Sequence, residues 1–245
     1  MYLVTSTRAD LAFPVGYLSR FVQRPNVAHA AALKRVLRYL AATQSQGVFF
    51  KNHGHGTVNK VVIDGYVDAD WGNCPETRKS VSGYVMKMVG GPVAWAARRQ
   101  SIVAFSTAEA EYAAACEACQ ESQSIKNVLM EIIGECDLEF NLGVDNQAAI
   151  SLATHPTYSR KTRHIERRLH FVREMAQQKD VNLWKVSGEM NPADLLTKPM
   201  GVTRLSKMKS LIGIQPDTYQ THHEMKRQTY RTDAEMRSHQ AARSE

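Results

Sequence analysis

The chain lacks the sequence features of a membrane or secreted protein. None of its apolar runs approaches the roughly 20 residues that cross a bilayer, and its first residues have neither the charged nor the apolar region of a signal peptide. Only four cysteines occur in 245 residues, too few for a disulfide scaffold. We therefore expect an intracellular protein, with a cytoplasmic particle and the nucleus as open alternatives.

Positive charge exceeds negative charge, with 31 Lys and Arg residues against 24 Asp and Glu residues and a formal net charge of +7. This excess favours polyanionic partners. Two short motifs have metal-binding alternatives. Cys116 and Cys119 form a C-x-x-C pair within a helical stretch, where buried thiols are the commoner explanation. His53 and His55 alternate with glycine in a turn, where we expect a loop.

Apolar periodicity divides the chain into a helical start and a mixed α/β part. Helical spacing predicts two helices at the start, over 7–24 with Asp10 as its cap and over 28–42. Further along, the pattern predicts strands over 61–67, 81–89, 92–97, 140–144 and 181–186, and helices over 106–133, 145–153, 164–178 and from Asn191. The first three strands should form an antiparallel meander with a hairpin at Gly90-Gly91, and the helix-linked strands should add in parallel.

Four acidic residues stand where a strand ends or a helix begins: Asp68, Glu111, Asp145 and Asp194. Carboxylates are rarely buried unless they are paired or bind metal. If the four converge at one edge of the sheet, they form a hard-oxygen site for Mg²⁺ or Mn²⁺. A pair of such ions cleaves phosphodiesters by holding the attacking and leaving oxygens.

Each acid also has a purely structural explanation. Asp145 with Asn146 would cap a helix, and Asp194 would favour a helix dipole. Asp70 fits an outward strand position or a salt bridge better than a catalytic position. Only the set of four points to a metal site.

Six runs of the chain closely resemble the ribonuclease H domain at the end of Ty1/copia-type retrotransposon polyproteins. They cover about residues 61–200, in the order and at the spacing of that family. The runs are Tyr66-Val67-Asp68-Ala69-Asp70-Trp71-Gly72, Arg78-Lys79-Ser80-Val81-Ser82-Gly83-Tyr84, Phe105-Ser106-Thr107-Ala108-Glu109-Ala110-Glu111-Tyr112, Asp145-Asn146-Gln147-Ala148-Ala149-Ile150, Lys161-Thr162-Arg163-His164-Ile165 and Ala193-Asp194-Leu195-Leu196-Thr197-Lys198-Pro199.

The resemblance implies an α/β, ribonuclease H-like mixed five-stranded sheet flanked by helices, with an N-terminal helical appendage. It divides the chain into residues 1–50, similar to the thumb- and connection-like end of a reverse transcriptase, a linker over 51–60, the ribonuclease H-like domain over 61–213 and a disordered tail over 214–245. We expect residues 1–50 to make few contacts with the α/β core. The polymerase motif Tyr-x-Asp-Asp is absent from the sequence, so reverse transcription is not expected.

The resemblance also implies hydrolysis of the RNA strand of RNA–DNA hybrids with two Mg²⁺ or Mn²⁺ ions, with the polymerase part of the same polyprotein as a further partner. Asp68 resembles the aspartate that bridges both metals, Asp145 the one after the fourth strand, and Asp194 the second-metal aspartate. Aligning Ala110-Glu111-Tyr112 selects Glu111 as the helix glutamate over Glu109, which suits a capping box with Ser106. A catalytically silent binding module and a degenerate remnant are the alternatives.

Further residues are expected to contact nucleic acid. Polar side chains beside the acids are suited to 2′-hydroxyl contacts: Asn73, Ser106, Thr107, Asn146 and Gln147. The basic segment that contains Arg160, Lys161 and Arg163 is either a phosphate-binding patch or a solvated helix face. Residues 186–191 contain no histidine, although many ribonucleases H have one in that loop.

Overall fold

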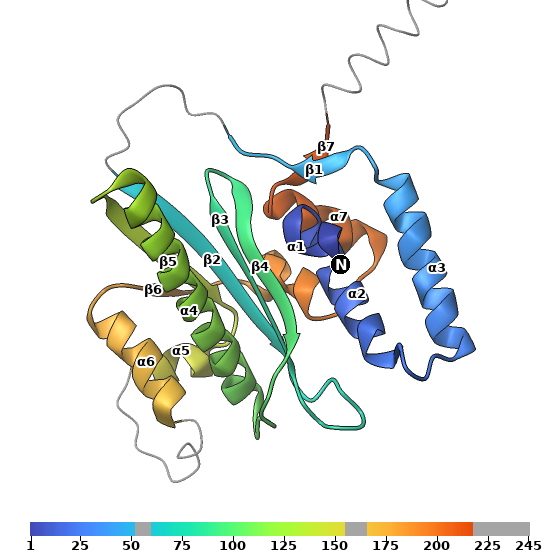
Figure 1. The fold of residues 1–245 in the computed structure, drawn as a ribbon. Helices are drawn as coiled ribbons and strands as arrows, with labels where there is room; N and C mark the ends of the chain where they lie inside the picture. Colours follow the sequence, from blue (N-terminus) through green and yellow to red (C-terminus); the bar gives the residue numbers. More distant parts are fainter. Residues whose placement is uncertain (52–59, 155–165, 218–245) are drawn as a thin grey trace, which may run out of the picture.

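A five-stranded mixed sheet forms the centre of the protein (Figure 1). The computed structural model describes residues 1–51, 60–154 and 166–217. Within these residues the strands lie in the order β4-β3-β2-β5-β6. Their bounds are β2 Lys60–Asp70, β3 Val81–Met88, β4 Gly91–Arg99, β5 Asp137–Val144 and β6 Asn182–Lys185. β2 pairs antiparallel with β3 and parallel with β5, which confirms the predicted meander and its parallel extension.

The hairpin between β3 and β4 turns one residue earlier than predicted. Met88 pairs with Gly91, so the turn is Val89-Gly90 rather than Gly90-Gly91. Both turn residues have positive φ, 51° and 79°. Two residues with positive φ give the tight turn whose twist matches that of the flanking strands.

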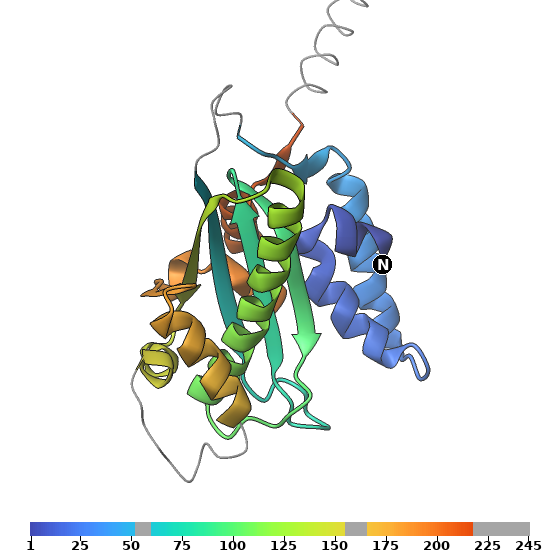
Figure 2. The same ribbon diagram turned by 60° about the vertical axis from the view of Figure 1, so that its left-hand side comes forward.

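Helices cover both faces of the sheet (Figure 2). On one face α4, Thr107–Ile133, crosses β2 and β3, and α5, Gln147–Thr154, and α6, Glu166–Gln177, pack against α4. On the other face lie the short 3₁₀ helix η5, Pro192–Leu196, and α7, Val202–Leu211. The predicted helix from Asn191 is thus two separate pieces. The predicted α/β architecture, a mixed five-stranded sheet flanked by helices with a helical region at the start, is confirmed.

Alternation along β3 explains why the sheet has two cores. Tyr84 and Met86 face α4 and join one apolar cluster, whereas Val85 faces the opposite side and joins a second. Cys116 and Cys119 are buried in the first cluster, as expected if they are core residues of the helix. His53 and His55 lie outside the described residues. Among the helices that the structure describes, none is both long and apolar enough to cross a bilayer.

Residues 1–50 are mostly helical, but the helix predicted over 7–24 is broken into three short ones, η1 Ala9–Leu11, α2 Ala12–Leu18 and η2 Ser19–Phe21. A further short helix, α1 Tyr2–Ser6, precedes them. The second prediction is confirmed, because α3 spans Val27–Ala42 and is capped by Asn26. Asp10 is not a cap as predicted. It is buried and forms an ion pair with Arg8.

The expectation that residues 1–50 make few contacts with the α/β core is wrong. Ala9 and Ala12 are buried in the second cluster together with residues of η5 and α7. The Trp95 indole N–H on β4 donates to the Val4 carbonyl at 2.7 Å. The small side chains of the two alanines allow the helical backbone to approach the sheet, so this region completes a core that would otherwise be exposed.

A second small sheet joins the helical start to the end of the described chain. β1, Gln46–Val48, pairs antiparallel with β7, Ile214–Pro216. The predicted tail therefore does not begin at 214, and residues 218–245 lie outside the described part. The linker prediction over 51–60 stays a prediction, since 52–59 are not described.

A buried polar network fixes the helical start internally. The Arg8 guanidinium donates to both oxygens of Asp10, at 2.9 and 2.7 Å, and to the carbonyl of Thr43 at 3.0 Å. The Tyr39 hydroxyl donates to Asp10 at 2.5 Å. The network links η1 to the end of α3, which has no fully buried residue of its own.

Arg8→Met should lower the free energy of unfolding by about 3–5 kcal/mol, because it leaves the Asp10 carboxylate buried and unpaired. The double variant Arg8→Met/Asp10→Leu should recover most of the loss. Urea unfolding measured by circular dichroism checks both. Equal losses in the single and double variants would contradict a paired buried charge.

Candidate metal centre

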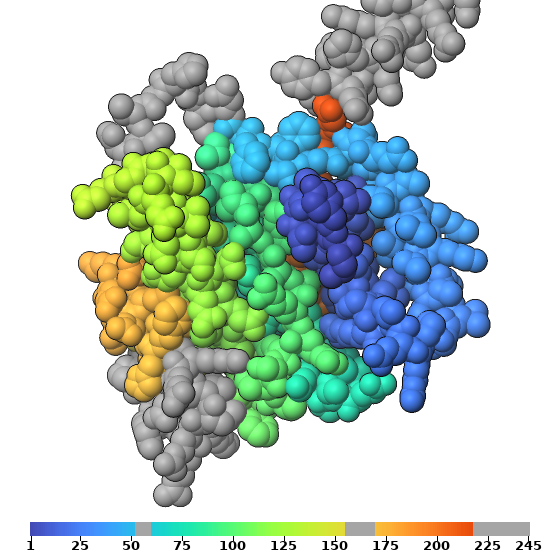
Figure 3. Space-filling model, in the orientation of Figure 1, coloured from blue at the N-terminus to red at the C-terminus, as the bar shows by residue number. Residues whose placement is uncertain are grey.

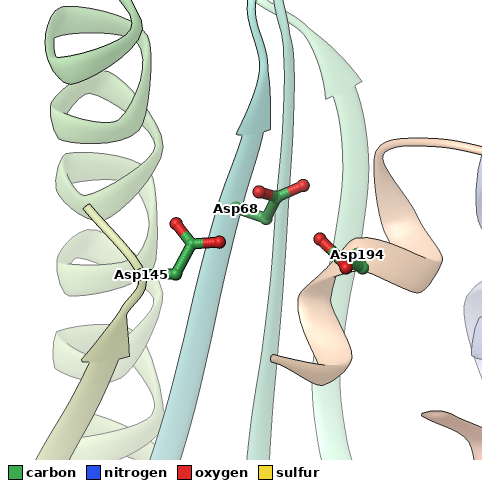
Figure 4. A group of neighbouring side chains, drawn as sticks. All are labelled: Asp68, Asp145 and Asp194. Carbon is green, nitrogen blue, oxygen red and sulfur yellow. The ribbon is translucent and has the colours of Figure 1, made fainter. Parts of the chain in front are cut away.

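Three aspartates from three separate elements meet near the carboxyl ends of the neighbouring strands β2 and β5 (Figure 4). Asp68 lies near the end of β2, Asp145 directly follows β5, and Asp194 lies in η5. Val67 pairs with Val144 in the parallel ladder, so Asp68 and Asp145 follow side by side. One carboxylate oxygen from each aspartate lies within 4.8 Å of those of the other two. Asp68 and Asp194 are only 2% and 1% exposed, and Asp145 is half-buried.

Asn191 and Gly83 bring η5 close enough to place Asp194. The Asn191 side chain caps η5 through the Ala193 N–H at 3.1 Å and donates to the Val67 carbonyl at 2.8 Å, beside Asp68. A Cβ at Gly83 on β3 would lie only 2.8 Å from Cβ of Leu196. The absence of that side chain lets η5 pack directly on the sheet.

Glu111 lies beside Asp68 but is not one of the three acids whose oxygens lie within 4.8 Å of one another, and Glu109 contacts the segment before α4. The Glu111 Oε1 accepts the Ala69 N–H at 3.1 Å, next to Asp68 in the chain. Glu109 instead accepts the Phe105 N–H at 2.8 Å, and its own N–H donates to Ser106 at 3.2 Å. The predicted capping role of Glu109 is thus present, although its carboxylate reaches Phe105 rather than the Ser106 N–H.

Burial and mutual repulsion set the protonation of the acids. Burial raises the pKa of Asp68 to about 6, with Lys198 and Thr197 opposing the shift. Burial, with the added charges of Asp68 and Asp145, raises the pKa of Glu111 to about 9. The protein therefore resists a full set of ionised carboxylates here unless a cation offsets them.

Two basic side chains supply positive charge. Lys198 Nζ lies 2.6 Å from Asp194 Oδ1 and 3.4 Å from Asp68 Oδ2. Arg204 donates to Asp194 Oδ2 and, at 2.9 Å, to the Gly188 carbonyl. The Thr197 hydroxyl donates to Asp68. Sequence reasoning did not assign these three residues, although Lys198 follows Asp194 by four positions and both Thr197 and Lys198 stand in a matched run.

The donor set fits a hard divalent cation. The candidate metal ligands of the three aspartates are all carboxylate oxygens, the ligands that Mg²⁺ and Mn²⁺ prefer. In the described part of the chain, Glu111 Oε2 is buried without a hydrogen-bond partner. A buried acceptor without a donor is costly, and a bound cation would satisfy it.

The other predicted residues occupy varied positions around the centre. Asn146 caps α5 by accepting the N–H groups of Ala148 and Ala149, at 2.9 and 3.2 Å. Thr107 and Gln147 are exposed at the starts of α4 and α5, and Ser106 caps α4. Asn73 donates to the half-buried Asp70 at 2.5 Å, so Asp70 is engaged away from the three aspartates. The basic residues Arg160, Lys161 and Arg163 lie outside the described residues.

Comparison with known proteins gives clear relatives, although no family model matches. The chain is 36% identical over 214 residues, 87% of its length, to the retrovirus-related Pol polyprotein from transposon TNT 1-94 of Nicotiana tabacum. It is 33% identical over 208 residues, 85% of its length, to the Pol polyprotein from transposon RE1 of Arabidopsis thaliana. It spans only 16% and 14% of those two polyproteins.

Two other similarities cover shorter segments. Secreted RxLR effector protein 161 of Plasmopara viticola is 49% identical over 122 residues, which make up 50% of this chain and 82% of the effector. Among solved structures, RNase H1 from the archaeon Halobacterium salinarum NRC-1 aligns with 56% of this chain and 94% of its own, at 21% identity and a TM-score of 0.41.

In metal-free protein, Glu111→Gln should raise the free energy of unfolding by on the order of 2 kcal/mol at pH 8 and by little at pH 5. The raised pKa means that the folded state holds a proton which the unfolded chain releases near pH 4.5. Folding stability is therefore lost as the pH rises from 4.5 towards about 9, and glutamine removes that loss. Urea unfolding in EDTA at both pH values measures it.

The exposed Glu131 on the same helix provides the control. Glu131→Gln should change stability by less than about 0.5 kcal/mol at either pH. A gain from Glu111→Gln that is the same at pH 5 and pH 8 would contradict the raised pKa.

Proposed function

Since this chain belongs to the family of retrovirus-related Pol polyproteins from copia-type transposons, we propose that it is a metal-dependent ribonuclease H that hydrolyses the RNA strand of RNA–DNA hybrids. The observation that carries the proposal is the meeting of Asp68, Asp145 and Asp194 at the edge of the sheet, with Glu111 alongside. The relatives are far longer than this chain, so the activity proposed belongs to this segment alone.

The four acids would hold two divalent ions, Mg²⁺ or Mn²⁺. Asp68 lies between Asp145 and Asp194, which suits it to contact both ions (Figure 4). The unsatisfied Oε2 of Glu111 offers a further ligand atom on the α4 side. When bound, such ions lower the pKa of the attacking water and stabilise charge on the leaving oxygen.

The remaining groups of the centre orient the acids rather than react. The Ala69 N–H fixes one oxygen of Glu111, and the Thr197 hydroxyl fixes one oxygen of Asp68. Held in this way, the carboxylates need little rearrangement when charge develops on the phosphate, and such preorganisation is a main source of catalytic rate. No Ser or Cys nucleophile is required by this chemistry.

Asp68→Asn and Asp145→Asn should each lower the cleavage rate at least about 100-fold, because each replaces a charged ligand with a near-isostere. Glu111→Gln should lose far more activity than Glu109→Gln, whose carboxylate caps α4. The assay is Mg²⁺- or Mn²⁺-dependent cleavage of a labelled RNA–DNA hybrid, with EDTA and an all-DNA duplex as controls.

Full activity in both aspartate variants would rule out the proposed centre. A larger loss from Glu109→Gln would shift the glutamate assignment by two residues. Hybrid binding without cleavage by the unaltered protein would instead favour the silent binding module.

We further propose that the polar residues at the helix starts and the basic segment contact the hybrid. Thr107 and Gln147 are exposed next to the acids, as contacts across a wide minor groove require.

Changing Arg160, Lys161 and Arg163 to Gln should weaken hybrid binding and lower its log–log salt slope by about one for each lost phosphate contact. Fluorescence anisotropy across a salt series measures the affinity and its salt slope. An unchanged slope would favour the alternative that the segment is a solvated helix face.

The polymerase part of the polyprotein is the partner that we propose for the surface of α3. Leu33 and Leu37 on this helix are 50% and 55% exposed. Leu37 also lines an open groove of about 490 Å³ with Leu3 of α1. Adjacent exposed apolar side chains commonly mark protein contacts.

A further inference from the structure

Lys198 occupies the space between the two buried aspartates of the centre. Its ammonium lies within 4 Å of one oxygen from Asp68 and one from Asp194, at 3.4 and 2.6 Å. A single divalent ion that bridged those two oxygens would lie within a few ångström of the ammonium. Since a bound ion and an ammonium repel each other strongly at such short distance, both cannot contact the pair at once.

The two basic residues differ in how firmly they are held. Arg204 on α7 is tied to the Gly188 carbonyl as well as to Asp194. Lys198 follows η5, its side chain is 40% exposed, and its described ion pairs are both with the aspartates. The Arg204 side chain is exposed to a similar extent, 44%, so the bond to Gly188 is what distinguishes it. A long, partly exposed lysine side chain can swing into solvent at little cost. Lys198 is therefore the group that can leave.

The charges explain why the lysine stays when no ion is bound. Asp68 and Asp194 are almost fully buried, and an unpaired buried carboxylate is strongly destabilising. Burial on its own would lower the pKa of Lys198, but the two aspartates more than offset this and raise it. The ammonium is thus present as a charge at any ordinary pH.

From this geometry we propose that Lys198 is an internal counter-cation that competes with divalent ions for Asp68 and Asp194. In the metal-free protein it offsets part of the negative charge of the pair, and it must move away for an ion to bind there. The proposal rests on the proposed metal centre and adds to it a residue that weakens metal binding. By linkage, the ion and the ammonium each reduce the affinity of the site for the other.

The test compares Mn²⁺ binding by the full chain and by Lys198→Met, without nucleic acid, by isothermal titration calorimetry and by the electron paramagnetic resonance signal of free Mn²⁺. Lys198→Met should bind Mn²⁺ on the order of tenfold more tightly. Without metal it should unfold at a lower temperature than the unaltered chain, and Mn²⁺ should raise its unfolding temperature by more. Lys207→Met, an exposed lysine on α7, is the matched control and should match the unaltered chain in both measurements.

Equal or weaker Mn²⁺ affinity in Lys198→Met would overturn the proposal while leaving the metal centre intact. Weaker affinity would mean that Lys198 orients the ligands. Absence of Mn²⁺ binding in both proteins would overturn the metal centre as well. If Lys198→Met does not fold, Lys198→Gln removes the charge with a polar side chain and must bind Mn²⁺ more tightly for the proposal to stand.

Discussion

Repulsion among carboxylates at one edge of the sheet is the constraint around which this protein is arranged. Asp68, Asp194 and Glu111 are all buried, and Asp145 is half-buried beside them. Relief comes from several separate elements. The Ala69 N–H on β2, the Thr197 hydroxyl after η5 and the Arg204 guanidinium on α7 all point at a carboxylate. Such a cluster persists only because the surrounding fold holds it in place, which is typical of functional rather than structural charge.

Much of this arrangement could be predicted from the sequence, because it depends on local patterns. The apolar pattern of the sequence predicts the strands β2 and β5, and their parallel pairing places Asp68 beside Asp145. The choice between Glu109 and Glu111 rests on a family resemblance and stays a prediction. In the structure Glu111 accepts the Ala69 N–H beside Asp68, whereas Glu109 accepts the Phe105 N–H. What could not be predicted were contacts between distant segments. Nothing near Lys198 in the sequence says that its ammonium reaches Asp68 across 130 positions.

The helical start was misjudged for a related reason. It was expected to make few contacts with the α/β core, yet Ala9 and Ala12 are buried against η5 and α7. Small residues give almost no amphipathic signal, because their burial depends on how closely two backbones approach. Leu33 and Leu37 of α3, which lies at the surface of the molecule (Figure 3), stay exposed together with Tyr2 and Val22, so the segment has one face in this core and another available to a partner. The pairing of β1 with β7 adds a backbone link that no periodicity could indicate.

Gly83 has a consequence for related sequences that keep all four acids. The position has no space for even one methyl group, since η5 lies directly against it. Gly83→Ala would push Asp194 away from Asp68 while every acid remained in the sequence. The presence of all four acids in a sequence therefore does not show that the three aspartates still meet. The glycine that faces η5 is as informative on that point as the acids themselves.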